Sequence, residues 1–227
     1  MIRPEYSKFI NFTKEIFDTN EFIPLHEPIF FGNEKKYILD TIDSTFVSSI
    51  GKYVDQFESM IAKFTGTKKA IAVVNGTCAL QVALRLAGVK SNEEVITQAL
   101  TFVATANAIN YLNCDPIFID VDLDNMGLSP DSLEDFLYKF AELRDDGTYN
   151  KKTGKKISAC VPMHTFGLMC RIDKIINICS KWKIQVVEDS AEALGSKYKN
   201  KSAGSFGLLS AFSFNGNKII TSGGGGA

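Results

Sequence analysis

The sequence lacks the features that would indicate a membrane, an oxidising compartment or a metal centre. No apolar run approaches the roughly 20 residues that span a bilayer, and residues 1–8 contain no signal-peptide core. The five cysteines are odd in number and include no Cys-x-x-Cys pair, so we expect free thiols in a reduced, cytoplasmic protein. A zinc site would have to combine Cys170 with His164 or His26, which lack ligand spacing, so no metal is expected.

Neither sign of charge is in excess, since 25 Lys and Arg stand against 26 Asp and Glu. This balance indicates neither a nucleic-acid surface nor a membrane-binding face. The sequence also has no Ser/His/Asp nucleophile elbow, no Gly-x-x-x-x-Gly-Lys and no His-Glu-x-x-His, which removes the commonest competing enzyme classes. What remains is a chain of 227 residues with the composition of a soluble globular protein, long enough for one large domain.

Short β-branched runs alternate with helical patterns along this chain. We expect strands at 70–74, 94–97, 116–120, 157–162, 184–188 and 209–214, with helices at 77–87, 102–112 and 172–182 and a further one that Ser129 caps. The alternation predicts an α/β fold with a mostly parallel sheet sandwiched by helices. Ligands of such sheets bind beyond the carboxyl ends of the strands, so residues at those ends are the candidates for a site.

Three segments do not follow the alternation. Residues 1–50 contain one helical pattern, at 33–48, and we expect them to join a large domain of residues 51–227. Residues 144–156 are polar without an apolar period and predict an exposed insertion or hairpin. The glycine run 223–226 is more typical of a turn or linker than of a natural end, so we expect the chain to be part of a longer protein.

A lysine and an aspartate follow two of the predicted strands with the arrangement of a pyridoxal phosphate site. Lys218 comes after the Ser-Phe strand, and Asp189 ends the strand before it, 29 residues earlier. A lysine forms a Schiff base with the aldehyde of pyridoxal phosphate, and a carboxylate keeps the pyridine nitrogen protonated so that the ring accepts electrons. The alternative for Asp189 is a cap for a following helix.

Other strand ends carry groups that suit the same cofactor, and each also has an ordinary interpretation. Gly76 and Thr77 open a helix, where free N–H groups and a hydroxyl suit a phosphate, but a plain strand-to-helix turn with a threonine cap fits as well. Ser213 could add a second hydroxyl for the phosphate or bond to backbone. Phe102 could stack on a flat ring or lie in the core.

Two further polar residues follow predicted strands. Glu192 lies three residues beyond Asp189, where it would touch the ring hydroxyl or complete a capping box. His164 ends the fourth strand and could contact the ring or a substrate, although a lone histidine is more often structural.

The order of these motifs resembles that of the DegT/StrS-type (DegT/DnrJ/EryC/StrS) sugar aminotransferases, which are fold-type I pyridoxal phosphate enzymes. The likeness runs along nearly the whole chain and includes residues 23–25, 51–58, 101–109 and 188–196. It implies a fold-type I large domain, a homodimer with shared active sites, and a C-terminal small domain that is missing here. The likeness is strongest to nucleotide-sugar 4-aminotransferases of the legionaminic-acid branch, which the N-terminal extension and the 144–156 insertion fit.

The resemblance also implies roles for individual residues. Lys218 would be the catalytic Schiff-base lysine, and Asp189 would pair with the pyridine nitrogen. The other cofactor-binding residues would be Gly76, Thr77, Phe102, Glu192 and Ser213. Glu192 stands where many relatives have glutamine, and Ser48, like His164, is a candidate for substrate contact.

The activity implied by the resemblance is transfer of an amino group from L-glutamate to a nucleotide-linked 4-keto-6-deoxy sugar, for surface-glycan or nonulosonic (legionaminic) acid biosynthesis. The alternatives are amination at C3, a GDP or dTDP carrier, or a regulator that binds pyridoxal phosphate without turnover. A dehydratase of the same family is disfavoured, because those relatives have histidine where this chain has Lys218. No nucleic-acid or membrane partner is expected.

Overall fold

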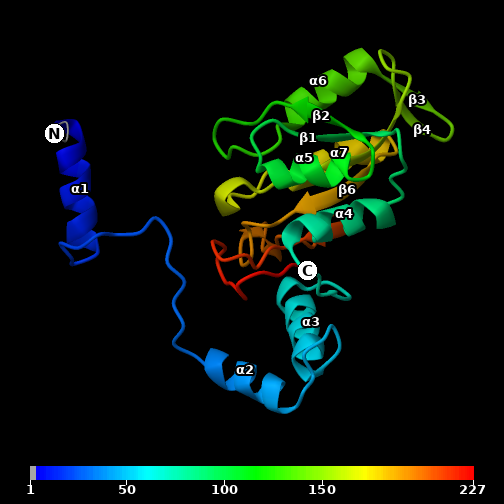
Figure 1. Cartoon of the computed structure of the whole chain (residues 1–227). Coiled ribbons are helices and arrows are strands. Elements are labelled where there is room, and N and C mark those ends of the chain that lie inside the picture. The colour runs from blue at the N-terminus through cyan, green and yellow to red at the C-terminus, as the bar shows by residue number, and fades with distance from the viewer. Residues whose placement is uncertain (1–3) are drawn as a thin grey trace. The chain divides into compact units, whose positions relative to one another are not determined.

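The computed structural model describes residues 4–227 (Figure 1). Its helices are α1 (Pro4–Ile16), α2 (Glu34–Asp43), α3 (Lys52–Thr65), α4 (Gly76–Leu86), α5 (Val103–Asn110), α6 (Pro130–Phe140) and α7 (Ile172–Lys181). Its strands are β1 (Glu94–Gln98), β2 (Asp115–Ile119), β3 (Ala141–Arg144), β4 (Gly147–Asn150), β5 (Lys156–Val161), β6 (Gln185–Asp189), β7 (Lys197–Tyr198), β8 (Lys201–Ser202) and β9 (Leu209–Ala211). The chain divides into two compact units after Phe31, and every candidate site residue lies in the second.

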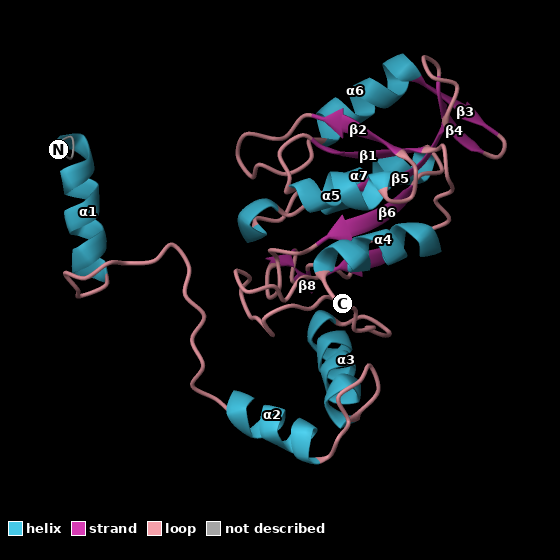
Figure 2. Cartoon of the chain, in the orientation of Figure 1, coloured by secondary structure: helices cyan, strands magenta, loops and turns pink. Residues whose placement is uncertain are grey.

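A seven-stranded sheet forms the centre of the second unit, with helices packed around it (Figure 2). Strands β2, β1, β5, β6 and β9 pair in that order, each parallel to the next. The hairpin β3–β4 extends the sheet in the antiparallel sense from β5. The predicted α/β fold with a mostly parallel sheet is therefore confirmed, and so is a hairpin near residues 144–156. This hairpin is more than an exposed insertion, because Thr148 and Asn150 are buried.

Apolar side chains cover both faces of the sheet. Val95 and Ile96 are neighbours in β1 and point to opposite faces, as successive strand residues do. Ile96 packs with Leu133 of α6 and Ile175 of α7, whereas Val95 packs with Leu84 of α4 and with residues of α5. With both faces buried in this way, the carboxyl-end edge of the sheet is where polar side chains can gather.

The strand predicted at residues 70–74 is wrong. Only Val73 pairs there, in an isolated antiparallel bridge with Gly226. The backbone N–H of Ala72 donates to the carboxylate of Glu58 at 2.8 Å, so it is not available to a strand ladder. The β-branched pattern identified extended chain but did not reveal whether a partner strand pairs along its length. The last strand is also shorter than predicted and ends at Ala211.

A groove of about 660 Å³ lies between this extended segment and β9. Its lining is mostly apolar and includes Ala79, Val82 and Ala83 of α4. None of the candidate site residues lines it. This groove is therefore separate from the predicted site.

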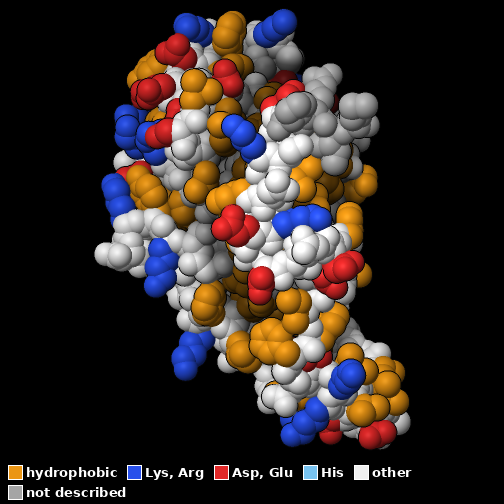
Figure 3. All heavy atoms as spheres, turned by 90° about the vertical axis from the view of Figure 1, so that its left-hand side faces the viewer, with side chains coloured by type: hydrophobic (Ala, Val, Ile, Leu, Met, Phe, Trp, Pro, Cys, Tyr) orange, Lys and Arg blue, Asp and Glu red, His pale blue; other side chains and the backbone are white. Residues whose placement is uncertain are grey.

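Helix α2 differs from the other helices of the second unit because none of its residues is buried. Its Tyr37, Ile38, Leu39 and Ile42 are all exposed. Figure 3 shows hydrophobic side chains beside charged ones at the lower end of the view, at the height of α2. Within residues 4–227, no helix combines the length and the apolar character needed to cross a membrane.

Candidate active site

Asp189 ends β6 and is almost completely buried, with 3% of its surface exposed. Its Oδ2 accepts a hydrogen bond from the Thr105 hydroxyl at 2.7 Å, and its Oδ1 accepts one from the Ala191 N–H at 3.2 Å. Within residues 4–227, no basic side chain forms an ion pair with it. Burial raises the pKa of Asp189, and the bond from Thr105 offsets only part of that rise. The carboxylate therefore lacks a cationic partner.

Lys218 brings a nearly buried amine to the same edge of the sheet. Its side chain is 14% exposed, and its Nζ lies 3.3 Å from Oε1 of Glu192. The Nζ also lies 5.9 Å from the centre of the Phe102 ring. The second oxygen of Glu192 accepts the N–H of Phe166 at 2.9 Å. Phe166 has a φ of +54°, which is uncommon outside glycine. Glu192 therefore contacts both the Lys218 amine and the backbone of the turn at Phe166.

Gly76 and Ser213 lie side by side, as a shared phosphate site requires. A Cβ added to Gly76 would come within 2.8 Å of the Ser213 Cβ, so this approach needs glycine. Gly76 begins α4, and the Asn75 side chain caps the helix by accepting the Cys78 N–H at 2.8 Å. The first N–H groups of α4, including that of Thr77, have no partner within the helix. Free N–H groups at the start of a helix favour the binding of an anion.

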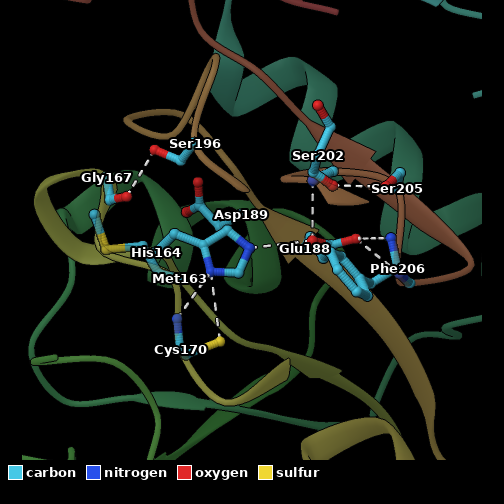
Figure 4. Close-up of polar contacts among 12 residues, drawn as sticks. Met163, His164, Gly167, Cys170, Glu188, Asp189, Ser196, Ser202, Ser205 and Phe206 are labelled. Atoms are coloured by element: carbon cyan, nitrogen blue, oxygen red, sulfur yellow. Dashed lines mark hydrogen bonds and ion pairs between the residues drawn. The ribbon is translucent and has the colours of Figure 1, made fainter. Parts of the chain in front are cut away.

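Glu188, the neighbour of Asp189 in β6, reaches the opposite way into the interior (Figure 4). Its Oε1 accepts the N–H groups of Phe206 at 2.6 Å and Gly207 at 2.7 Å. Its Oε2 accepts the N–H of Gly204 at 3.0 Å and lies 3.1 Å from Nε2 of His164. Burial alone would raise the pKa of Glu188, but these bonds outweigh burial and lower it. Glu188 thus ties β6 to the loop that precedes β9.

His164 belongs to this interior network. It is completely buried, with Nε2 against Glu188 and Nδ1 3.4 Å from both the N–H and the Sγ of Cys170 (Figure 4). This placement favours the structural interpretation of His164 over a contact with ring or substrate. Ser48 is exposed, and its hydroxyl accepts the Ile50 N–H at 3.2 Å. The contacts of Ser48 do not connect it to the Lys218 cluster, so its substrate role stays a prediction.

Several of the ordinary interpretations from sequence are wrong. Asp189 and Glu192 cap nothing, because no helix follows β6 in the described chain. Phe102 is not a core residue, since 64% of its surface is exposed. The cap of α4 is Asn75 and not Thr77. The structure therefore leaves these side chains available for a ligand, and their assigned roles remain predictions.

Sequence reasoning did not single out Thr105 or Gln98. Gln98 is completely buried at the end of β1, where its Nε2 donates to Thr165 Oγ1 at 2.8 Å and its Oε1 accepts the N–H groups of Leu128 and Met163. It thereby joins the loop after β2 to the loop after β5 at this edge of the sheet. The available signal was a polar residue ending a strand with an apolar centre, but that signal does not reveal its partners.

The residues at this edge fit pyridoxal phosphate. A protonated pyridine nitrogen would give the buried Asp189 the cationic partner that it lacks. The paired Gly76 and Ser213 and the end of α4 suit the phosphate, and the exposed ring of Phe102 offers a flat surface for stacking. Lys218 supplies the amine that the cofactor aldehyde requires.

Comparisons with known proteins agree with this geometry. Residues 30–227 match the DegT/DnrJ/EryC1/StrS aminotransferase family. The chain is 41% identical over 204 residues to EpsN of Bacillus subtilis (strain 168), whose name is that of a pyridoxal phosphate-dependent aminotransferase. It is 38% identical over 206 residues to the GDP-perosamine synthase of Escherichia coli O157:H7. These matches cover 90% and 91% of this chain but 50% and 52% of the relatives, so the chain spans about half the length of the curated relatives it matches.

A solved structure extends the comparison to three dimensions. The crystal structure of DesI in the presence of its TDP-sugar product superposes with a TM-score of 0.79 at 27% identity, over 92% of this chain and 49% of DesI. The expected fold of pyridoxal phosphate aminotransferases is therefore confirmed, and pyridoxal phosphate is the cofactor of this group of enzymes. The specific likeness to the legionaminic-acid branch is not among these findings. The chain belongs to the DegT/DnrJ/EryC1/StrS aminotransferase family.

Proposed function

We propose that this chain forms the cofactor-binding part of an enzyme that transfers the amino group of L-glutamate to a nucleotide-linked 4-keto-6-deoxy sugar. The observation that carries the proposal is the meeting of Lys218, Asp189 and the Gly76–Ser213 pair at one edge of the sheet. The names of the relatives, which mention GDP-perosamine and a TDP-sugar product, support a sugar carried by a nucleotide.

Each residue has a distinct task in this proposal. When bound, the cofactor supplies an aldehyde that captures amino groups and a ring that accepts electrons. Lys218 holds the cofactor before the substrate arrives and then carries a proton to and from the substrate carbon, as a general base and acid. Asp189 keeps the ring nitrogen protonated. The phosphate and the ring are held by Gly76, Thr77, Ser213, Phe102 and Glu192.

The finer parts of the proposal concern substrate and assembly. We assign the product to surface-glycan or nonulosonic (legionaminic) acid synthesis in the cytoplasm, and we expect a homodimer whose subunits share active sites. We also keep the division into an N-terminal segment, residues 1–50, and a cofactor-binding domain, residues 51–227. These expectations come from the family resemblance.

A GDP-linked keto sugar is the second candidate substrate. The 38% identity to a GDP-perosamine synthase favours it. A regulator that binds the cofactor without turnover is the third alternative. A substrate panel separates the first two, and the response to glutamate alone separates both from the third.

The first experiment is borohydride reduction of the purified protein with pyridoxal phosphate, followed by peptide mass spectrometry. We expect one cofactor adduct, on the peptide that contains Lys218, and none in Lys218→Ala. Addition of L-glutamate should then convert the bound cofactor to its amine form, seen as the loss of the visible absorption band of the Schiff base. A folded protein with no adduct at Lys218 would refute the assignment of Lys218 as the Schiff-base lysine. An adduct at Lys218 whose cofactor is not converted by glutamate would favour a regulator that binds the cofactor without turnover.

A further inference from the structure

We propose that Thr105 is a positioning residue whose hydroxyl holds the Asp189 carboxylate in the orientation that pairs with the pyridine nitrogen of pyridoxal phosphate. The inference rests on the proposed function, since it concerns the same cofactor. It adds a residue to the site that neither the motifs nor the family resemblance assigns.

The contact itself is short and buried. The Thr105 hydroxyl lies 2.7 Å from Oδ2 of Asp189, and the two residues are 1% and 3% exposed. Oδ1 accepts the N–H of Ala191. A carboxylate has about four lone-pair positions, so two directions remain for another donor. Two bonds to fixed donors leave the carboxylate little rotational freedom, and they determine where the remaining directions point.

The hydrogen bonds around Thr105 also have a defined direction. Its Oγ1 lies 2.7 Å from the hydroxyl of Thr101, and that pair is within bonding distance in either sense. An ionised carboxylate only accepts, and a hydroxyl has one hydrogen to give. Thr105 therefore donates to Asp189 and accepts from Thr101. Such a chain polarises its members in the same direction and strengthens the final bond to the carboxylate.

The position of Thr105 in α5 couples this bond to the rest of the site. Thr105 lies one turn after Phe102, and its N–H donates to the Phe102 carbonyl at 3.0 Å. The first turn of α5 thus presents both the exposed aromatic ring and the donor to Asp189. A threonine within a helix can satisfy its hydroxyl locally, by bonding back to the carbonyl four residues earlier. Thr105 instead bonds a carboxylate 84 residues away in the sequence, which a purely local role does not require.

The test compares two cofactors that differ at one atom. Pyridoxal phosphate has a ring nitrogen, and 1-deazapyridoxal phosphate has a carbon in its place. Thr105→Val keeps the shape of the side chain and removes the donor, while Thr105→Ser keeps the hydroxyl. The dissociation constants of both cofactors are measured by equilibrium dialysis on the 227-residue protein and its variants, with Asp189→Ala as the reference for complete loss of the nitrogen contact.

Thr105→Val should weaken pyridoxal phosphate by about tenfold, as expected for losing a hydrogen bond to a charged group. It should leave the affinity for the deaza compound within about twofold of the wild-type value. Thr105→Ser should restore the wild-type preference between the two cofactors. Equal weakening of both cofactors by Thr105→Val would reduce Thr105 to a packing residue, and an unchanged preference would also overturn the proposal.

A second variant covers the possibility that Thr105→Val does not fold, as judged by circular dichroism. Thr101→Val removes the donor to Thr105 and should lower the preference for the nitrogen-containing cofactor by about two- to threefold, since it weakens the bond to Asp189 without abolishing it. An unchanged preference would contradict the hydrogen-bond chain from Thr101 through Thr105 to Asp189. The measurement needs no glutamate and no sugar, so a failure of transamination with an intact cofactor preference would refute the proposed function alone.

Discussion

Glu188 and Asp189 are adjacent in one strand, carry the same charge and are both buried, yet the fold treats them in opposite ways. Glu188 faces three backbone N–H groups and His164, and its pKa is lowered. Asp189 receives two hydrogen bonds, and its pKa is raised by burial. A carboxylate whose partners are complete stabilises the fold, whereas one whose partners fall short marks where an external cation is expected.

The surroundings of the two carboxylates are built differently as well. The donors to Glu188 are backbone groups of a loop pressed against β6, where a Cβ on Gly207 would lie 2.7 Å from the Val186 carbonyl. The donors to Asp189 are the Thr105 hydroxyl of α5 and a single backbone group, the N–H of Ala191. Backbone donors cannot be altered by rotating a side chain, so the Glu188 side is the more rigid of the two.

The largest effect should come from replacing Glu188 by its amide, and the same change at Asp189 should have a much smaller effect. Glu188→Gln places an NH₂ group among N–H donors and should lower the free energy of unfolding by about 3–5 kcal/mol, the usual cost of breaking a buried charged network. Asp189→Asn should change it by about 1 kcal/mol or less, because only two hydrogen bonds are affected and a buried charge is removed. Urea unfolding of the cofactor-free proteins measures both. Equal losses would remove the distinction between the two residues.

The same pair should differ in how stability depends on pH. The folded pKa of Glu188 lies below its unfolded value of about 4.3, so its contribution is present above that value and is lost as the pH falls through the folded pKa. Asp189 has a raised folded pKa, so its ionisation lowers stability as the pH rises. The difference in urea midpoint between wild type and Glu188→Gln should therefore shrink as the pH is lowered from 7 to 3. A constant difference over that range would contradict the pKa direction for Glu188.

A glycine at the predicted phosphate position should give the next largest effect. Gly76→Ala forces a Cβ to within 2.8 Å of Ser213 and should cost about 1–3 kcal/mol of unfolding free energy, as overpacking does. It should also weaken cofactor binding, because the two segments that we propose to bind the phosphate are pushed apart. Gly224→Ala is the matched control, since no atom lies within 4 Å of its Cβ position, and it should change stability by about 0.5 kcal/mol or less. Similar losses in both variants would mean that the close approach to Ser213 does not matter.

The ion pair between Lys218 and Glu192 should contribute least. Its side chains are 14% and 26% exposed, so a double-mutant cycle with Lys218→Met and Glu192→Gln should give a coupling of about 0.5–1 kcal/mol. The exposed pair Lys139–Asp135, 63% and 73% exposed, should give less. A coupling energy above the loss of stability in Glu188→Gln would contradict the expectation that Glu188 contributes more to stability than this ion pair.

Much of the site could be predicted from sequence, because parallel strands bring their carboxyl ends to one edge. Asp189, Lys218, Gly76 and Ser213 were identifiable from their positions after β-branched runs, with no knowledge of distances. The close approach of Gly76 to Ser213 does not follow from this rule, because the segment before Gly76 is not a strand of the parallel sheet. The alternation of strands and helices was sufficient to place Asp189 and Ser213 at the same edge.

Orientation and pairing could not be predicted in this way. Thr105 looks like any helical threonine until the structure places Asp189 beside it. His164 follows a strand as the site residues do, but its ring is completely buried against Glu188, and strand periodicity does not predict which loop folds over it. The extended segment at 70–74 has strand composition, yet the carboxylate of Glu58 binds its Ala72 N–H. Each of these outcomes depends on a partner distant in the sequence.

The approach of Gly76 to Ser213 also has a consequence for the order of events during synthesis. Ser213 follows Gly76 by 137 residues, so the second half of the proposed phosphate site leaves the ribosome on the order of ten seconds after the first, at ordinary elongation rates. Until then Gly76, at the start of α4, lacks its contact with Ser213. Contacts between such distant residues form late and slow the folding of a chain, so the nascent protein should acquire its cofactor only after Ser213 has left the ribosome and β9 has joined the sheet.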